Sequence, residues 1–271
     1  MSQNAGRPVV LCATAHPDDI EFMCAGTLLR LKEAGCEIHM WNISAGTCGT
    51  IAYSKEEIAR IRWQESQASA KLAGATPHPA IADDFEIYYD AATVAKAASV
   101  VRLVNPDIVL THSPQDYMED HQNTCRLLVT GAFTRGMPNF TPNPPRPPVS
   151  KQVALYHAMP HGLRDGLRRL VRAGQFVDVG SVLKTKREML ACHKSQKEWL
   201  DVSQGMDSYL NEMEAMSRQV GKLSGKFEYA EGWRRHSHLG FGAADYDPLA
   251  KLLGKACFTD PQYEKDLGEA P

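Results

Sequence analysis

The apolar residues near the start of the chain follow two different patterns. Residues 9–15 form a continuous apolar run without polar alternation, which is typical of a strand buried on both faces of a parallel sheet. Over residues 21–34 the apolar side chains recur at helical spacing, and Gly35 follows as a C-cap. Residues 38–43 are again strand-like. This order predicts a β-α-β unit with parallel strands and a right-handed crossover.

The same alternation continues along the chain. Further strands are expected at residues 106–112, 153–157 and 176–179, and helices at 54–73, 91–104, 125–134, 181–192 and 206–220. Residues 137–148 contain six prolines and are expected to be an extended loop rather than a domain boundary, because a strand pattern resumes after them. The chain is therefore predicted to be an α/β protein with a parallel sheet covered by helices.

Two of the predicted strands are followed in the sequence by side chains that can bind a metal. His16-Pro17-Asp18-Asp19 follows the first strand, and Asp120-His121 lies in the polar segment after the strand at 106–112. Carboxyl ends of parallel strands meet at one sheet edge, so His16, Asp19 and His121 can surround a single ion. Two histidines and one carboxylate are typical of catalytic zinc with an open fourth position. The alternative is a plain connection in which Asp18 or Asp19 caps the next helix, but the second half of the ligand set favours the metal.

Composition excludes several functional classes. Lys and Arg number 30 against 32 Asp and Glu, so no basic field indicates a nucleic-acid partner. The seven cysteines are scattered and lack Cys-x-x-Cys spacing, which favours reduced thiols in the cytoplasm. No apolar run has the length of a membrane span or of a signal peptide, and we expect no membrane partner. The glycine-containing loop at 44–50 lacks the dinucleotide fingerprint, which argues against a nucleotide-binding enzyme.

These motifs together resemble a known family. The segment from Ala15 to Asp19 after a buried strand, followed about a hundred residues later by Asp120-His121, is similar to the zinc-dependent N-acetylglucosaminyl deacetylases of the LmbE-like, or PIG-L, family. Arg62-x-x-Glu65 resembles the second-helix pattern of that family, and the segment 193–196 (His-x-Ser-Gln) resembles its late motif. The resemblance covers roughly residues 8–240, the size of a whole domain.

The resemblance implies a fold, a cofactor and an activity. The fold would be Rossmann-like, with a mostly parallel sheet and helices on both faces, in a single domain over residues 1–271. One Zn²⁺ per chain would be held by His16, Asp19 and His121, and Asp18 would act as general base on a zinc-bound water. Fe²⁺ or another divalent metal suits similar ligands. Arg62 would bind substrate instead of being a solvated helix residue, and the chain would form a homo-oligomer.

One position departs from the family pattern. The second motif of the family usually reads His-x-Asp-His, and its first histidine is thought to stabilise the oxyanion or to protonate the leaving amine. Met118 occupies that position here, and a thioether can do neither. Asp120 would have oriented the missing histidine and stays a catalytic candidate that braces another group, while Tyr117 is a candidate for substrate binding. The side chains considered for the replacement role are Tyr117, His112, His157 and His238.

The expected function is removal of an N-acetyl or other N-acyl group from a small amino sugar or its glycoconjugate. An amidase for a different N-acyl conjugate is the first alternative. A catalytically weakened metal- or sugar-binding protein is the second, because Met118 replaces the usual histidine. The histidines at 157 and 161 flank Pro160 and either reach the site or occupy a loop. His236-x-His238 could hold a second metal if it lay on a strand, but a solvated histidine pair is the commoner outcome.

Overall fold

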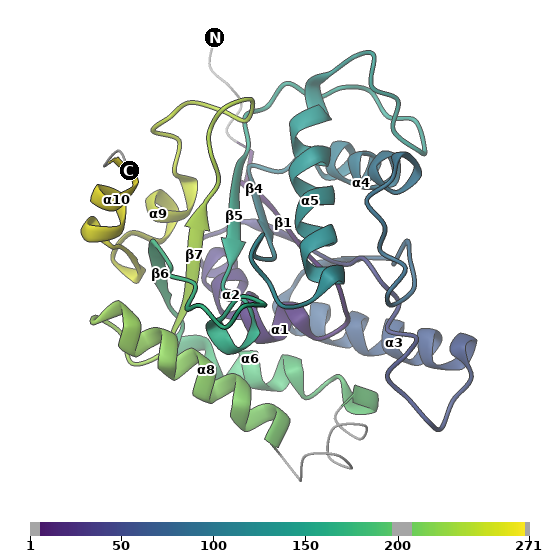
Figure 1. Cartoon of the computed structure of the whole chain (residues 1–271), viewed down its shortest axis with the longest axis horizontal. Coiled ribbons are helices and arrows are strands. Elements are labelled where there is room, and N and C mark those ends of the chain that lie inside the picture. The colour runs from purple at the N-terminus through teal and green to yellow at the C-terminus, as the bar shows by residue number, and fades with distance from the viewer. Residues whose placement is uncertain (1–5, 197–207, 269–271) are drawn as a thin grey trace.

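An eight-stranded sheet runs through the centre of the computed structural model, which describes residues 6–196 and 208–268 (Figure 1). The spatial order of the strands is β3-β2-β1-β4-β5-β7-β6-β8. Neighbours from β3 to β5 are parallel, and the pairs β5–β7, β7–β6 and β6–β8 are antiparallel. The predicted α/β fold with a mostly parallel sheet is therefore confirmed. The strands are β1 (Val9–Thr14), β2 (Glu37–Asn42), β3 (Thr76–His78), β4 (Ile108–Thr111), β5 (Ala154–Ala158), β6 (Gln175–Asp178), β7 (Ala230–Arg235) and β8 (Cys257–Thr259).

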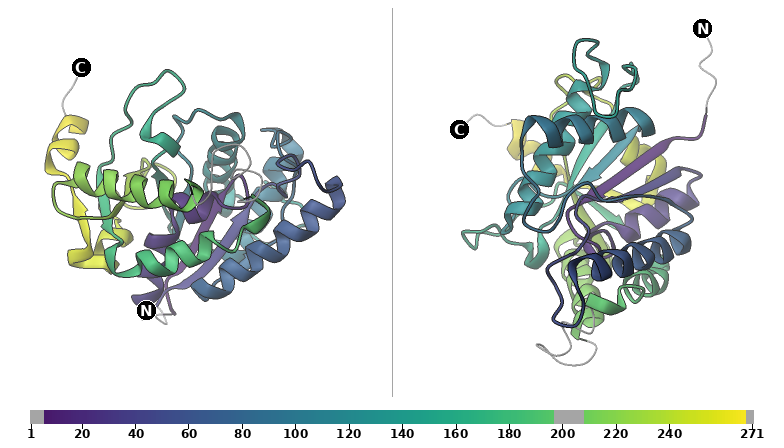
Figure 2. Two further views of the ribbon diagram at one scale, coloured as in Figure 1. Left: turned by 90° about the horizontal axis from the view of Figure 1, so that it is seen from below. Right: turned by 90° about the vertical axis from the view of Figure 1, so that its right-hand side faces the viewer.

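Helices cover both faces of this sheet (Figure 2). One face carries α4 (Ala91–Val104) and α5 (Glu119–Phe133). The opposite face carries α1 (Asp19–Met23), α2 (Ala25–Glu33), α3 (Lys55–Ala73), α6 (Leu183–Leu190) and α8 (Ser208–Ser224). The chain continues through α9 (Pro248–Leu253) and α10 (Pro261–Gly268), and short 3-10 turns lie at Thr134–Gly136, His161–Leu163, Gly180–Val182 and Gly254–Ala256. Within the described ranges, none of the helices is both long and apolar enough to cross a membrane.

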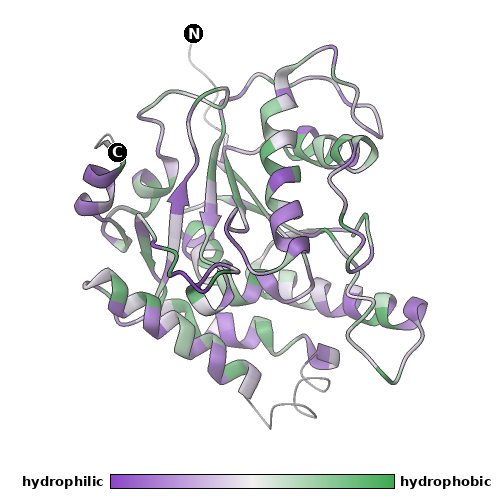
Figure 3. Ribbon diagram, in the orientation of Figure 1, coloured by the Kyte–Doolittle hydropathy of each residue, from purple (hydrophilic) through white to green (hydrophobic). Residues whose placement is uncertain are grey.

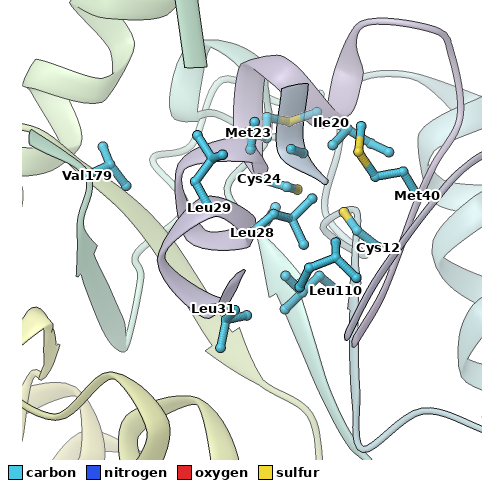
Figure 4. Close-up of a cluster of buried hydrophobic side chains, with 14 of the residues drawn as sticks. Cys12, Ile20, Met23, Cys24, Leu28, Leu29, Leu31, Met40, Leu110 and Val179 are labelled. Carbon is cyan, nitrogen blue, oxygen red and sulfur yellow. The ribbon is translucent and has the colours of Figure 1, made fainter. Parts of the chain in front are cut away.

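Burial on both faces explains the continuous apolar run of β1. Val10 and Cys12 belong to the same core cluster as Leu28 of α2. Cys12 and Leu28 lie close together in Figure 4. Leu11 and Ala13 point into the second core beneath α4 and α5. The helices are amphipathic by contrast, and purple and green segments alternate along α5 and α8 (Figure 3). Because β1 is covered on both faces, the polar residues of this segment follow the end of the strand, where the site lies.

Beside the polar motifs, two element boundaries differ from the prediction. The helix expected at 21–34 is split at Cys24, whose φ of -131° ends α1 before α2 begins. Helix α5 begins at Glu119, six residues before its predicted start, so Asp120 and His121 belong to its first turn. That turn has no apolar side chain to reveal its period, and its buried side chains, Asp120 and His121, lie at the site.

A buried ion pair anchors α1 and α2 to the second half of the chain. Lys186 and Glu231 are buried, with Nζ 2.7 Å from Oε1. Lys186 also donates to the carbonyl of Phe22 at 3.0 Å. The Glu231 carboxylate accepts the backbone N–H groups of Gly26 and Thr27, at 2.8 and 2.7 Å, where the N-terminus of α2 favours negative charge. The segment that carries Asp18 and Asp19 is thus held in place by α6 and β7.

Candidate metal centre

The polar ends of β1 and β4 meet in the middle of the parallel part of the sheet. These strands are neighbours, and the strand order runs outward from them in both directions, through β2 and β3 on one side and β5 on the other. Such a switch point is where ligands bind in open α/β sheets. His16 follows β1 and His121 follows β4, so the topology brings together residues 105 positions apart (121 − 16).

His16, Asp19 and His121 each direct one potential ligand atom to a common point. These three atoms lie within 4.8 Å of one another. His16 Nδ1 is 3.3 Å from Asp19 Oδ2, and His121 Nε2 is 3.5 Å from Asp19 Oδ1. Ligands bound at 2.0–2.2 Å to a tetrahedral ion are about 3.4 Å apart. The spacing therefore suits a small divalent cation.

The outward nitrogens of both histidines face carboxylates. His16 Nε2 is 3.0 Å from Asp120 Oδ2, and His121 Nδ1 is 3.0 Å from Asp116 Oδ1. This carboxylate–histidine pairing orients imidazoles that bind metals. Burial lowers the pKa of His16, but the Asp120 and Asp19 carboxylates outweigh it and raise that pKa well above its ordinary value. The pKa of His121 is raised in the same way, by Asp19 and Asp116 against burial. Concentrated negative charge around two imidazoles fits a cation between them.

His112 lies behind this group. Its ring is fully buried and stacks on His121, with centroids 4.0 Å apart. His112, Asp116 and His121 also form a trio of close ligand atoms. However, His112 Nε2 accepts the backbone N–H of Ala15 at 2.9 Å, which occupies its lone pair. The trio of His16, Asp19 and His121 is therefore the better candidate, and His112 supports the ligand His121.

Asp18 has a backbone conformation that is rare for its residue type. It stands at the N-terminus of α1 with φ 118°, in the left-handed region, which costs of the order of 1–3 kcal/mol and is typical of functional sites. Its side chain makes no capping hydrogen bond and instead accepts the hydroxyl of Tyr209 at 2.6 Å. The Asp19 carboxylate accepts the backbone N–H of His16 at 2.7 Å. The alternative in which these aspartates merely cap the helix is thus wrong for Asp18.

The environment of Asp18 suits proton transfer. Burial, together with the neighbouring charge of Asp19, raises the pKa of Asp18 to about 6, although His193, Tyr209 and Arg62 act in the opposite direction. A carboxylate with a pKa near neutrality is matched to general acid–base work.

A cavity of about 520 Å³ opens above these residues. Arg62 lies in its wall and is only 3 % exposed, so the interpretation as a solvated helix residue is wrong. Its guanidinium donates to the carbonyl of Gly49 at 2.9 Å and to Gln196 of the late motif. Tyr117 is 55 % exposed and lies edge-on to His121. The other lining residues are His16, Asp18, Asp19, Phe22, Met23, Cys48, Gly49, Asp84, Phe85, Met118, His121, His161, Gln196, Tyr209 and Glu212.

The structure sorts the side chains considered for the place of the missing histidine. Met118 itself lines the cavity, and so does Tyr117. His157 is buried, and its Nδ1 lies 2.9 Å from the backbone carbonyl oxygen of His112. His238 lines a separate cavity of about 480 Å³ near the C-terminal elements, and because β7 ends at Arg235, it does not lie on a strand. Sequence reasoning missed Tyr209 and Glu212, whose contacts with the site span long sequence separations.

Comparison with known proteins agrees with this geometry. The family model described as "PIG-L: GlcNAc-PI de-N-acetylase" matches residues 11–132, which include all three candidate ligands. Residues 11–132 of the chain are thus similar to the PIG-L family, and the expected resemblance is confirmed. The Asp18, Arg62 and Met118 positions also lie inside the matched PIG-L segment, whereas Tyr209 and Glu212 lie beyond it.

The individual relatives of this chain include a deacetylase and a hydratase. Diacetylchitobiose deacetylase of Thermococcus kodakarensis is 28% identical over 232 residues, covering 83% of this chain and 82% of the relative. 4-oxalmesaconate hydratase of Pseudomonas putida is 25% identical over 207 residues, covering 72% and 77%. Among solved structures, N,N'-diacetylchitobiose deacetylase from Pyrococcus horikoshii has a TM-score of 0.70 at 24% identity, over 89% of this chain and 88% of that one. The structural likeness confirms the fold.

Proposed function

We propose that the protein is a metal-dependent N-deacetylase acting on an N-acetylated amino sugar or glycoconjugate. The observation that carries the proposal is the trio of His16, Asp19 and His121 at the floor of a cavity, with Asp18 beside it. The similarity to a diacetylchitobiose deacetylase supports the substrate class.

Each side chain has a distinct part in the proposed reaction. When bound by His16, Asp19 and His121, a divalent metal supplies Lewis-acid polarisation of the carbonyl and lowers the pKa of water. Asp18 takes a proton from the attacking water, and the Tyr209 hydroxyl keeps its carboxylate in place.

Other residues orient the ligands and the substrate. Asp120 faces His16 and the backbone N–H of Phe85, so we assign it to positioning the ligand rather than to contact with substrate. Arg62 contributes a buried positive charge that can bind polar groups of the substrate.

Several finer expectations belong to the same proposal. We take the native metal to be one Zn²⁺ per chain, with Fe²⁺ as the alternative, because the nitrogen and oxygen donors suit both. The sheet draws strands from residues 9 to 259, which supports a single domain over residues 1–271. The free cysteines, of which Cys12, Cys24, Cys36 and Cys125 are buried, support a reducing, cytoplasmic environment. We further expect a homo-oligomer.

The test is acetate release from a panel of N-acetylated mono- and disaccharides. We expect hydrolysis by the purified protein, loss of activity with a chelator, and recovery when Zn²⁺ or Fe²⁺ is returned. Asp19→Asn is the matched variant, because it removes the shared carboxylate and should remove stoichiometric metal. Release of other acyl groups but not of acetate would favour a different N-acyl conjugate. Bound metal without hydrolysis of any amide would instead indicate a binding protein.

Hydration of an unsaturated polycarboxylate is a second candidate. The similarity to 4-oxalmesaconate hydratase favours it, as does Arg62, whose buried guanidinium suits a carboxylate as well as a sugar hydroxyl. Water addition to such a substrate abolishes its conjugated ultraviolet absorbance. A fall in that absorbance, without acetate release from the sugar panel, would replace the deacetylase assignment.

A further inference from the structure

Amide hydrolysis requires a proton for the departing nitrogen, because an amine anion is too basic to leave. In this chain Met118, which stands where the second motif of the resembled family has a histidine, lines the cavity and cannot donate a proton. Asp18 is occupied with the proton of the attacking water and with the hydroxyl of Tyr209. Asp18 could pass that proton on to the nitrogen, but a second group on the cavity wall that holds and releases a proton would protonate the nitrogen independently of Asp18.

Most proton-bearing side chains of the cavity are unsuited to this role. Arginine does not release its proton in proteins, which excludes Arg62. Phenols have an ordinary pKa of about 10 and keep their proton at neutral pH, which disfavours Tyr117 and Tyr209. The Asp84 carboxylate accepts the hydroxyl of Ser44 at 2.8 Å and the backbone N–H of Cys48 at 2.9 Å. Histidine is the side chain that changes charge nearest neutral pH, and one further histidine lines the cavity.

That histidine is His161, at the start of the 3-10 turn after β5. Its Nε2 is 3.1 Å from Oε1 of Glu212 on α8, and its side chain is 31 % exposed. Its ring packs edge-on to Phe22 with centroids 5.3 Å apart, and lies 6.5 Å from the ring of Tyr117. Tyr117 in turn contacts the candidate ligand His121, so one side chain separates His161 from the metal centre.

The contacts of His161 resemble those of a catalytic imidazole. A carboxylate at one ring nitrogen fixes the orientation of the ring, as in an acid–base dyad. The charged and titratable groups that face it are Glu212 from α8 and Tyr117 from the segment before α5, while α1 presents the uncharged ring of Phe22. Since Nε2 faces Glu212, Nδ1 is the nitrogen that is left for the substrate.

We propose that His161, positioned by Glu212, is the proton donor to the leaving nitrogen, in place of the histidine that Met118 has replaced. This inference rests on the proposed deacetylase function. Water adds its oxygen to the amide carbon as Asp18 takes one proton. The C–N bond then breaks with its electron pair on nitrogen, and nitrogen takes a proton from His161 Nδ1. Acetic acid and the free amine leave, and solvent returns the proton from Asp18 to His161.

The test compares two substrates that differ in their need for a proton donor. His161→Asn should lower kcat for the N-acetyl sugar by about 10²–10⁴-fold with little change in KM. Hydrolysis of 4-nitrophenyl acetate should fall less than about threefold, because nitrophenolate leaves without protonation. Metal content and Tm should stay at wild-type values. His238→Asn, in the separate cavity, is the matched control and should leave both reactions unchanged.

The outcomes separate this inference from the function on which it rests. Equal hydrolysis of the N-acetyl sugar by wild type and His161→Asn would overturn the inference and leave the deacetylase proposal intact. Equal losses on both substrates would also overturn it, because they indicate a structural role. A wild-type protein that is inert towards every amide would overturn both. If His161→Asn fails to fold, Glu212→Gln replaces it, and a selective loss on the amide of roughly tenfold supports the dyad.

Discussion

Two groups of histidines in this protein have opposite surroundings. In the site, His16 and His121 each face one carboxylate outward and share Asp19 between them. On β5, His157 Nε2 faces His236 Nδ1 at 2.9 Å, and its other nitrogen faces a carbonyl and a thiol. The carboxylates raise the pKa of both site histidines, whereas burial, together with His236, lowers the pKa of His157 to about 3.

The difference shows what turns a histidine cluster into a candidate metal centre. Paired imidazoles alone remain neutral and act as hydrogen-bonded core residues. Carboxylates on both sides supply the charge and the orientation that a cation requires. In the described part of the chain, both groupings with metal-ligand spacing lie at the switch point, and neither includes His236 or His238.

The largest effect is expected from a residue of the site that is not a ligand. Asp18→Asn should lower kcat by about 10²–10⁴, the usual size of a general-base contribution, because the amide cannot accept the proton of water. Metal content should stay stoichiometric by elemental analysis, since Asp18 is outside the candidate ligand set. Wild-type turnover with full metal would remove Asp18 from the mechanism.

Metal removal should destabilise the carboxylate-bearing cluster. At a metal concentration of 100 times Kd, binding contributes about 2.7 kcal/mol to the free energy of unfolding. A chelator should therefore lower Tm at pH 7.5. Because the pKa values of His16 and His121 are raised, protons compete with metal as pH falls, and they stabilise the metal-free fold at low pH. The chelator effect should shrink by pH 5.5, and an effect that grew on acidification would contradict the ligand assignment.

The carboxylates of Asp116 and Asp120 should affect metal affinity, whereas the His157–His236 pair should not. Asp116→Asn and Asp120→Asn should each weaken metal binding by about 10–100-fold, because they remove the charge behind a ligand histidine. The matched variant is His236→Asn, which disturbs the His157–His236 pair. Titration with a chromophoric chelator measures the affinity, and an equal loss in all three variants would erase the distinction between the clusters.

The histidine pair should instead control stability in acid. His157 has a lowered pKa in the folded protein, so the unfolded chain binds more protons below about pH 6.5. Stability is therefore present above that pH and is lost progressively as pH falls towards 3. The loss from pH 7 to pH 5 is about 2 kcal/mol. Urea denaturation of His157→Gln at both pH values should show a smaller difference than wild type, and an unchanged difference would contradict the neutral core assignment.

Most of the parallel half could be predicted from the sequence because its strands are continuously apolar and its helices are long. Helix α4 occupies the predicted residues 91–104, and α3 begins with the predicted capping box at Ser54. β3 was missed because it has only three residues and contains Pro77. β7 includes Gly232 and Arg234 and lacks a clear apolar period.

The site was predictable only where its chemistry lies within short motifs. His16, Asp19 and His121 stand in recognisable contexts at strand ends, and the structure brings them together. Tyr209 and Asp18 are 191 residues apart in the sequence, and no local sequence pattern predicts their contact. His161 follows a strand like any loop residue, and only the folded chain shows that it faces the same cavity as Met118.

The buried bond between Lys186 and Glu231 makes the matched PIG-L segment dependent on the remainder of the protein. A fragment ending at residue 132 would keep all three candidate ligands but lose both partners of that bond, which fixes the Phe22 carbonyl and the start of α2. The segment that carries the ligand motif therefore cannot be moved to another protein on its own. Redesign of substrate selectivity should begin from the intact chain. It should vary the cavity-lining residues that follow residue 132 and keep the Lys186–Glu231 ion pair unchanged.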